Sequence, residues 1–300
     1  MPFTTSHDVP DRDVGRLTTT EGLPPAERDV RHVLELAEAI RPMPASVGRL
    51  AAVVSDEFGQ LSDVAAVVRE DPMLVTNLLT EANSAASSPL SKITTVEAAV
   101  TRLGLARVMA VASLAVFGPD ARKALDAYRM PAGALIEHAV RSSYVAEAAY
   151  GMLSGELDAS VVTAALLHDL GMLALDMVLD RDQVEEAMAE GVVITTVERE
   201  LVKVDHAELG ALMLETWALP ACLITAVRHH HEPFSVSDPA THVVAVADLL
   251  THERYPTGAV DGDSRGDVLA SLLDRLWLDR AELVRRSDRM MERAGLPIQS

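Results

Sequence analysis

Apolar side chains recur at three- and four-residue spacing along most of this chain, which is the pattern of helices with one buried face. In its first occurrence the pattern stops before Pro42, and the spaced residues are Val30, Val33, Leu34, Leu36 and Ile40. No segment alternates apolar and polar residues between turn signals, as a half-buried strand does. The sequence therefore predicts an all-α fold without a substantial sheet.

Proline, glycine and capping residues divide the first half into short helices. Proline can begin a helix but cannot continue one, so the Asp71-Pro72 step separates two of them. The other residues placed to cap or to end helices are Gly59, Ser62, Thr94, Glu97 and Gly104. The predicted helices cover residues 45–58, 61–70, 72–85, 96–104 and 105–117.

The second half has longer predicted helices, at residues 131–153, 159–178, 206–219, 221–231 and 239–253. Their starts are marked by Pro131, Asp205, Pro220 and Asp238. Between them, the acidic residues 181–191 are predicted to be exposed and residues 192–204 to form a connector. Residues 268–296 predict two further amphipathic helices, with Trp277 and Leu283 on the sides expected to be buried.

These elements group into four regions. They are a disordered polar tail at 1–23, an N-terminal helical bundle at 24–125, a second helical unit at 126–254, and a linker with C-terminal helices at 255–300. The last region could cover the core or mediate formation of a homodimer, and the sequence leaves both open.

Composition limits the class of protein. Hydrophobic residues make up 49% of the chain but aromatic residues only 3%, so Leu, Val, Ala and Met must build the core, as suits helices. A net charge of −19 without a basic cluster argues against nucleic acid as a partner. Cys222 is the single cysteine, which excludes an intramolecular disulfide and a thiolate zinc cluster and suits a reducing compartment. We find no signal peptide and no run of about 18 uncharged apolar residues, so we expect a soluble cytoplasmic protein without a membrane partner.

The chemistry centres on residues 161–175, an apolar run that contains His168 and Asp169. A buried carboxylate costs several kcal/mol unless a cation or a hydrogen bond compensates it, so Asp169 needs partners. The candidates, each on or at the end of a predicted helix, are His138, His206, His230, His231 and Asp248. Imidazole and carboxylate ligands together suit zinc, iron, manganese or nickel rather than magnesium or calcium.

Several strings of the chain are similar to those of a known family. DPMLVTNLLTEANSA, ITTVEAAVTRLGLARV, ALLHDLG and KVDHAELGALMLETWALP resemble, in this order, the motifs of the HDOD family, a bacterial signalling module related to the HD metal phosphohydrolases. The resemblance covers roughly residues 27–248. It implies a small helical bundle packed on an HD-like helical core, usually without demonstrated catalytic activity and with a role in signal transduction.

The resemblance also implies a ligand set. The minimal HD set corresponds to His138, His168, Asp169 and Asp248, and the larger HD-GYP relatives add residues that match His206, His230 and His231. These residues would hold one or two divalent transition-metal ions, or the centre could be vestigial and hold none. If the protein is active, Asp169 with a metal-bound water is the candidate catalytic group, because a bimetal centre can activate water and clamp a phosphodiester oxygen.

Three departures from the relatives weaken the case for catalysis. Met172 replaces the lysine that contacts phosphate, Ala134 replaces a glutamate of the three-metal versions, and the GYP loop is missing after Glu232. We therefore expect a regulatory module that acts through a protein partner or a small nucleotide ligand. The alternatives are a metal-dependent phosphohydrolase or phosphodiesterase, and a metal- or redox-sensing switch whose oligomeric state depends on metal.

Simpler roles compete with these interpretations. A single histidine on an apolar stripe is more often a core residue than a ligand, and only the joint match of several positions favours a metal. In the first half, Asp71, Asn83 and Glu97 match motif positions, and capping and hydrogen bonding between helices are their simplest roles.

Overall fold

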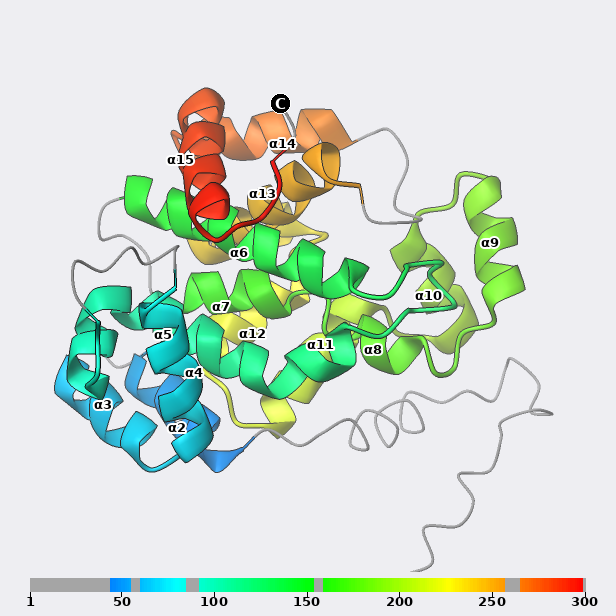
Figure 1. Ribbon diagram of the computed structural model, residues 1–300. Coiled ribbons are helices and arrows are strands. Elements are labelled where there is room, and N and C mark those ends of the chain that lie inside the picture. The colour runs from blue at the N-terminus through cyan, green and yellow to red at the C-terminus, as the bar shows by residue number, and fades with distance from the viewer. Residues whose placement is uncertain (1–43, 55–59, 85–91, 154–158, 257–264, 299–300) are drawn as a thin grey trace, which may run out of the picture.

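The computed structural model describes residues 44–54, 60–84, 92–153, 159–256 and 265–298. Within these ranges the chain forms α-helices and one short 3-10 turn, without a strand (Figure 1). The predicted all-α fold is therefore confirmed. The tail predicted at 1–23 and the helix pattern at 30–40 lie outside the described residues.

The N-terminal bundle consists of short helices packed around the beginning of a long one. Its elements are α2 (Ala45–Val54), α3 (Leu61–Arg69), α4 (Pro72–Ala82) and α5 (Val96–Ala121), and α5 contacts the other three. Among the described helices, α5 alone is long and apolar enough to cross a membrane by length and composition. More than half of its most apolar window, 56%, is buried against other helices, which is typical of a core helix.

The polar residues noted in this half have the simple roles expected of them. Asp71 caps α4 by accepting hydrogen bonds from the backbone of Met73 and Leu74, at 2.9 and 3.3 Å. The Asn83 side chain exchanges hydrogen bonds with both backbone groups of Ile93, at 2.8 and 2.9 Å. Glu97 forms an ion pair with Arg69. These contacts cap α4, join its end to Ile93 and link α5 to α3.

Two of the predicted boundaries in this half need adjustment and a third agrees with the structure. The helix α3 starts after Gln60 rather than at a Ser62 cap, and Asp63 accepts a hydrogen bond from the Gln60 backbone at 3.1 Å. Thr95, not Thr94, caps α5 by accepting from Ala98 at 3.3 Å. The break predicted at Gly104 is confirmed, because the backbone there leaves the helical region with a φ of 76° and α5 consists of two helical segments that meet at this kink.

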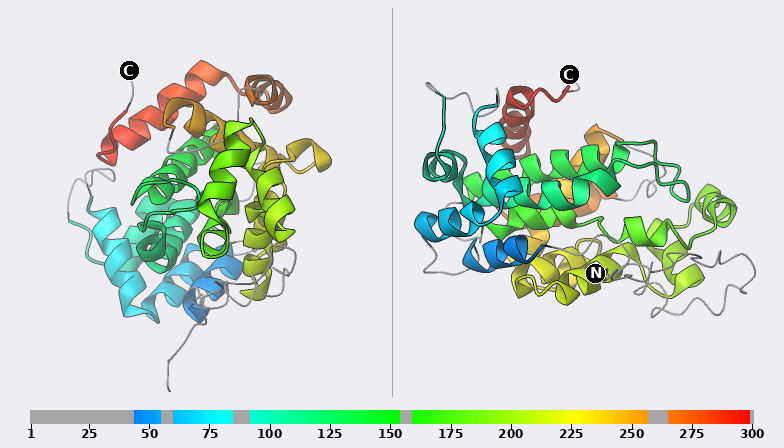
Figure 2. Two further views of the ribbon diagram at one scale, coloured as in Figure 1. Left: turned by 90° about the vertical axis from the view of Figure 1, so that its right-hand side faces the viewer. Right: turned by 60° about the horizontal axis from the view of Figure 1, so that its bottom comes forward.

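The second unit is built around α6, which is sandwiched between other helices (Figures 1 and 2). Its elements are α6 (Ala134–Met152), α7 (Ser160–Leu167), α8 (Met172–Leu175), α9 (Arg181–Ala189), α10 (Ile194–Val202), α11 (His206–Thr216), α12 (Ala221–Arg228) and α13 (Pro239–Arg254). The helices α7 and α13 both pack on α6, and α12 packs on α7. The segments that carry the candidate ligands are therefore neighbours in space.

Two predictions for this unit were wrong. The single helix expected at 159–178 is divided into α7 and α8 by a turn at residues 168–171, so His168 and Asp169 lie at a helix end. The connector expected at 192–204 contains α10. The acidic residues 181–191 form α9, which buries only Val184.

The C-terminal helices cover the core. The helix α14 (Arg265–Arg275) packs on α13, and α15 (Arg280–Arg293) packs on α6 (Figure 1). Leu283 is fully buried, as predicted, but Trp277 is 94% exposed. The reason is that α14 ends at Arg275 and the chain reverses at Trp277 with a positive φ of 54°, so this side chain does not share the buried face.

One glycine allows two of the ligand-bearing segments to meet. A Cβ atom added at Gly171 would lie 2.1 Å from the carbonyl oxygen of His206 and 2.8 Å from the backbone nitrogen of Gly210. The turn that follows Asp169 therefore packs directly on the backbone of α11. This approach places Asp169 beside His206.

Replacing Gly171 by alanine should destabilise the protein by about 3 kcal/mol, because the new methyl group overlaps backbone that cannot move aside. Gly151→Ala is the matched control, since Gly151 lies in α6 with no atom within 4 Å of the added Cβ. That change should stabilise the protein by about 0.5–1 kcal/mol through helix propensity. Urea denaturation measures both, and a Gly171→Ala protein as stable as the wild type would contradict the close backbone approach.

Candidate metal centre

Seven side chains from distant parts of the chain converge inside the second unit. Two come from within long helices, His138 from the second turn of α6 and Asp248 from the interior of α13. The others lie at helix ends: His168 and Asp169 after α7, His206 at the start of α11, and His230 and His231 after α12. The structure thus brings together all seven residues that the sequence singled out.

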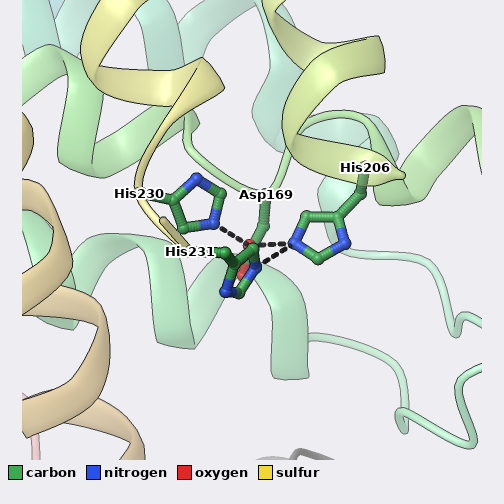
Figure 3. Close-up of side chains that lie close together, drawn as sticks. All are labelled: Asp169, His206, His230 and His231. Carbon is green, nitrogen blue, oxygen red and sulfur yellow. Dashed lines mark hydrogen bonds and ion pairs between the residues drawn. The ribbon is translucent and has the colours of Figure 1, made fainter. Parts of the chain in front are cut away.

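Asp169 is shared between two sets of partners. Its Oδ2 atom lies 3.1 Å from His168 Nε2 and 3.6 Å from His138 Nε2. Its Oδ1 atom lies 3.4 Å from His206 Nε2 and 3.7 Å from His230 Nε2 (Figure 3). The two carboxylate oxygens therefore face different groups of histidines. We call these groups, each with its Asp169 oxygen, the first set (His138, His168, Asp248) and the second set (His206, His230, His231).

Within each set the ligand atoms point at one another. In the first set, Asp248 Oδ1 lies 3.2 Å from His138 Nε2 and 3.6 Å from His168 Nε2, and the two Nε2 atoms are 3.2 Å apart. In the second set, the Nε2 atoms of His206 and His231 are 2.7 Å apart (Figure 3). Asp169 lies with His206, His230 and His231 in one group whose ligand atoms are all within 4.8 Å.

Hydrogen bonds on the far side of the rings fix their orientation. The Nδ1 atoms of His168 and His230 lie 2.8 and 2.6 Å from the carbonyl oxygens of Ala165 and Val227. A carbonyl only accepts, so each Nδ1 carries a proton, and Nε2 is the ring nitrogen that faces the interior of the cluster. His230 Nε2 is buried and has no hydrogen-bond partner. Metal-binding histidines are held in this way.

Glu198 orients His206, and sequence reasoning missed it. This fully buried carboxylate accepts hydrogen bonds from the backbone and the Nδ1 atom of His206, both at 2.9 Å, and from Tyr128 at 2.7 Å. It lies on α10, within the segment predicted to be a connector. A signal was present, because Glu198 stands in an apolar stripe formed by Ile194, Val197, Leu201 and Val202.

The cluster attracts positive charge. Burial alone would lower the pKa of His168, but the carboxylates of Asp169 and Asp248 outweigh it and raise that pKa to about 10. Burial also opposes the charge on His206, whose pKa is nevertheless raised well above its ordinary value by Glu198 and Asp169. In the other direction, burial would raise the pKa of Asp169, but His168 holds it well below its usual range. Protons can meet this demand for charge, and a metal cation can replace them.

The donor set fits a divalent transition metal. Nitrogen from imidazole and oxygen from carboxylate are borderline ligands, and the inward-facing Nε2 atoms and carboxylate oxygens can supply them once a metal replaces the bound protons. The cluster could therefore bind a metal. The remaining described histidines of this half lie outside it, since His229 contacts Ser235 at 3.2 Å and His242 contacts the Pro233 carbonyl at 3.1 Å, while the His252 ring is 6.3 Å from that of His138.

Comparison with known proteins gives a family and a fold. The HDOD domain model matches residues 40–233 of the chain. A curated protein of Treponema pallidum (strain Nichols), described only as uncharacterized, is 24% identical over 255 residues, which are 80% of this chain and 48% of that protein. The chain thus spans about half the length of that relative.

Solved structures share the architecture. A protein of Marinobacter aquaeolei VT8, provisionally described as a signal transduction protein, matches with a TM-score of 0.66 and 21% identity over 91% of this chain and 68% of that one. A provisionally described phosphohydrolase from Shewanella amazonensis SB2B matches with a TM-score of 0.61 and 21% identity, over 88% and 97% of the two chains. At this identity the likeness is one of fold.

Replacing Glu198 by glutamine should weaken metal binding by the second set about 10–100-fold while leaving the first set nearly unaffected. An amide offers one oxygen, so it cannot accept from both His206 groups and from Tyr128. Calorimetric titration with Mn²⁺ separates the two sites. Glu200→Gln, at an exposed residue of the same helix, is the control, and equal losses at both sites or at neither would contradict the role of Glu198.

In metal-free protein, stability should decrease as the pH rises from about 6.5 to 8.5. Because the folded-state pKa of His168 is raised to about 10, its contribution is fully present below its unfolded pKa of about 6.5 and is lost as the pH rises through the folded value. We expect the free energy of unfolding to fall by about 1–2 kcal/mol over this range, measured by urea denaturation with chelator. Saturating metal should flatten the dependence, because a bound cation replaces the protons; a level profile without metal would count against a proton-holding cluster.

Proposed function

The chain belongs to the HDOD domain family, and we propose that it is a regulatory module of bacterial signal transduction, with a metal centre in its HD-like half. It would act through contact with a protein partner or by sensing a small nucleotide ligand. The observation that carries the proposal is a complete set of metal ligands beside a residue that is uncharged here and is a lysine in hydrolytic relatives. Met172, which stands where hydrolytic relatives have a phosphate-contacting lysine, is an apolar side chain only 6% exposed.

The residues of the centre have separable roles. Asp169 would serve both metal positions, one through each oxygen, and the first and second sets would complete them. A divalent metal bound there would polarise a phosphoryl oxygen and lower the pKa of bound water. Glu198 and the carbonyl groups of Ala165 and Val227 hold the rings in the required orientation.

The surroundings of the cluster favour a regulatory over a hydrolytic role. Arg199 is a positively charged residue near the second set. Its guanidinium group forms ion pairs with Asp205 at 2.5 Å and with Glu232 at 2.9 Å. These carboxylates are the sequence neighbours of His206 and His231, so Arg199 fastens two ligand-bearing segments to each other. A charge used in this way is not available to hold a substrate phosphate.

The second candidate is a metal-dependent phosphohydrolase or phosphodiesterase. It is favoured by the completeness of the ligand set and by partial exposure of the site, since the Asp169 side chain is 14% exposed and His231 is half-buried. Two adjacent metals are the arrangement that many phosphodiester-cleaving enzymes use. In this candidate Asp169 and the two ligand sets would hold the metals, and Asp169 would be central to catalysis.

Metal content and turnover of the same preparation test the proposal. We expect elemental analysis of the purified chain to find one or two divalent transition-metal ions per molecule, and Asp169→Ala to lose them. We expect no metal-dependent hydrolysis of cyclic dinucleotides or of a generic phosphodiester such as bis(p-nitrophenyl) phosphate.

The outcomes separate the two candidates. Bound metal without turnover supports the regulatory module. Metal-dependent turnover that Asp169→Ala abolishes establishes the hydrolase instead. A preparation that binds no metal even after incubation with Mn²⁺, Fe²⁺ or Zn²⁺ removes the metal centre from both. Glu190→Gln, at an exposed carboxylate of the same half, should behave as the wild type in every assay.

A further inference from the structure

A cavity lined by charged side chains lies away from the metal cluster. It has a volume of about 280 Å³ and shares no residue with either ligand set. It lies where α4, α5, α6 and α15 meet, and both α5 and α15 pack on α6. Its polar lining consists of Glu81, Arg102, Arg107, Tyr144, Glu147 and Arg293.

One nitrogen of the Arg107 guanidinium group at this cavity has no hydrogen-bond acceptor. The residue is only 9% exposed, and its Nε and Nη2 atoms donate to Glu81 Oε1 at 3.0 and 2.8 Å. Nη2 also contacts the Tyr144 hydroxyl, and the guanidinium lies over the Tyr144 ring at 4.4 Å. Nη1, by contrast, is buried without a hydrogen-bond partner. A buried charged donor of this kind demands an acceptor.

The neighbouring groups make that acceptor an anion. Three arginines and two glutamates line the cavity, so its wall carries net positive charge in a chain whose overall charge is −19. Glu147 Oε2 is also buried without a partner. Burial raises the pKa of Glu147, against the opposing effect of Arg107.

We propose that this cavity binds a phosphate group, with Arg107 Nη1 as the buried donor and with Arg102 and Arg293 at the mouth. The three guanidinium groups come from α5 and α15, so they approach from different directions. A tetrahedral oxyanion presents oxygens in more directions than a carboxylate, and arginine matches phosphate geometry well. The volume is just below the range of about 300–1,000 Å³ for drug-sized ligands, so the ligand is inorganic phosphate or a small phosphate monoester.

Calorimetric titration of the full chain tests the site, with chelator present so that the metal cluster cannot capture the anion through a metal. The two probes are inorganic phosphate and glycerol 3-phosphate, at constant ionic strength maintained with chloride. We expect saturable binding of at least one probe, and the tighter of the two identifies the source of the phosphate group. Arg102→Gln and Arg293→Gln should each weaken binding about tenfold, since each removes a charged donor.

Matched variants distinguish binding in this cavity from binding driven by net charge or located at the metal cluster. Arg289→Gln, at an exposed arginine of α15 outside the cavity, should bind as the wild type does; an equal loss there means that net charge alone drives binding and overturns the proposal. Asp169→Ala should keep saturable phosphate binding, because Asp169 does not line the cavity. A loss in Asp169→Ala without a loss in the arginine variants would place the anion at the metal cluster and overturn it. Absence of saturable binding of both probes would end the proposal.

Discussion

A carboxylate buried among imidazoles governs the C-terminal half of this molecule. Asp169 directs one oxygen at His138 and His168 and the other at His206 and His230. An isolated buried charge of this kind is strongly unfavourable, whereas one enclosed by cations or hydrogen-bond donors is tolerated. Helices that are distant in sequence must therefore stay close together, because the loss of any one leaves the remaining polar groups buried without compensation.

The backbone makes this arrangement possible in two ways. Long helices supply His138 and Asp248 from positions inside the helix, where neighbouring turns hold the side chains in place. The other ligands lie at helix ends, where the backbone can approach another segment closely. Gly171 allows such an approach to the start of α11, and Glu198 then fixes the ring that α11 presents. The precision of the centre thus depends on residues that are not ligands.

The sequence predicted the helical class because periodicity and helix-breaking residues are local signals, and it predicted the seven ligands because polar residues interrupt apolar helices at positions that resemble the motifs of the HDOD family and its relatives. Interpretation failed where tertiary contacts decide the outcome. The apolar run at 159–178 has no proline to mark the turn that divides α7 from α8, and that turn is stabilised by packing on α11. Glu198 was missed because a glutamate in a segment predicted to be a connector is expected to face water, and only its pairing with His206 and Tyr128 explains its burial. Trp277 is apolar, yet the reversal between α14 and α15 turns it outward.

The metal cluster and the phosphate cavity are connected by a single helix. His138 lies on α6, and Tyr144 and Glu147 follow it on the same helix, at most nine residues and about 14 Å away along the axis. A packed helix moves as a rigid element, so a shift that follows occupation of the cavity would also displace His138 relative to Asp169. The opposite also holds, because coupling between two binding sites is reciprocal. A regulatory module needs this kind of connection more than it needs catalytic turnover, and α6 is the element through which metal and anion would act on each other.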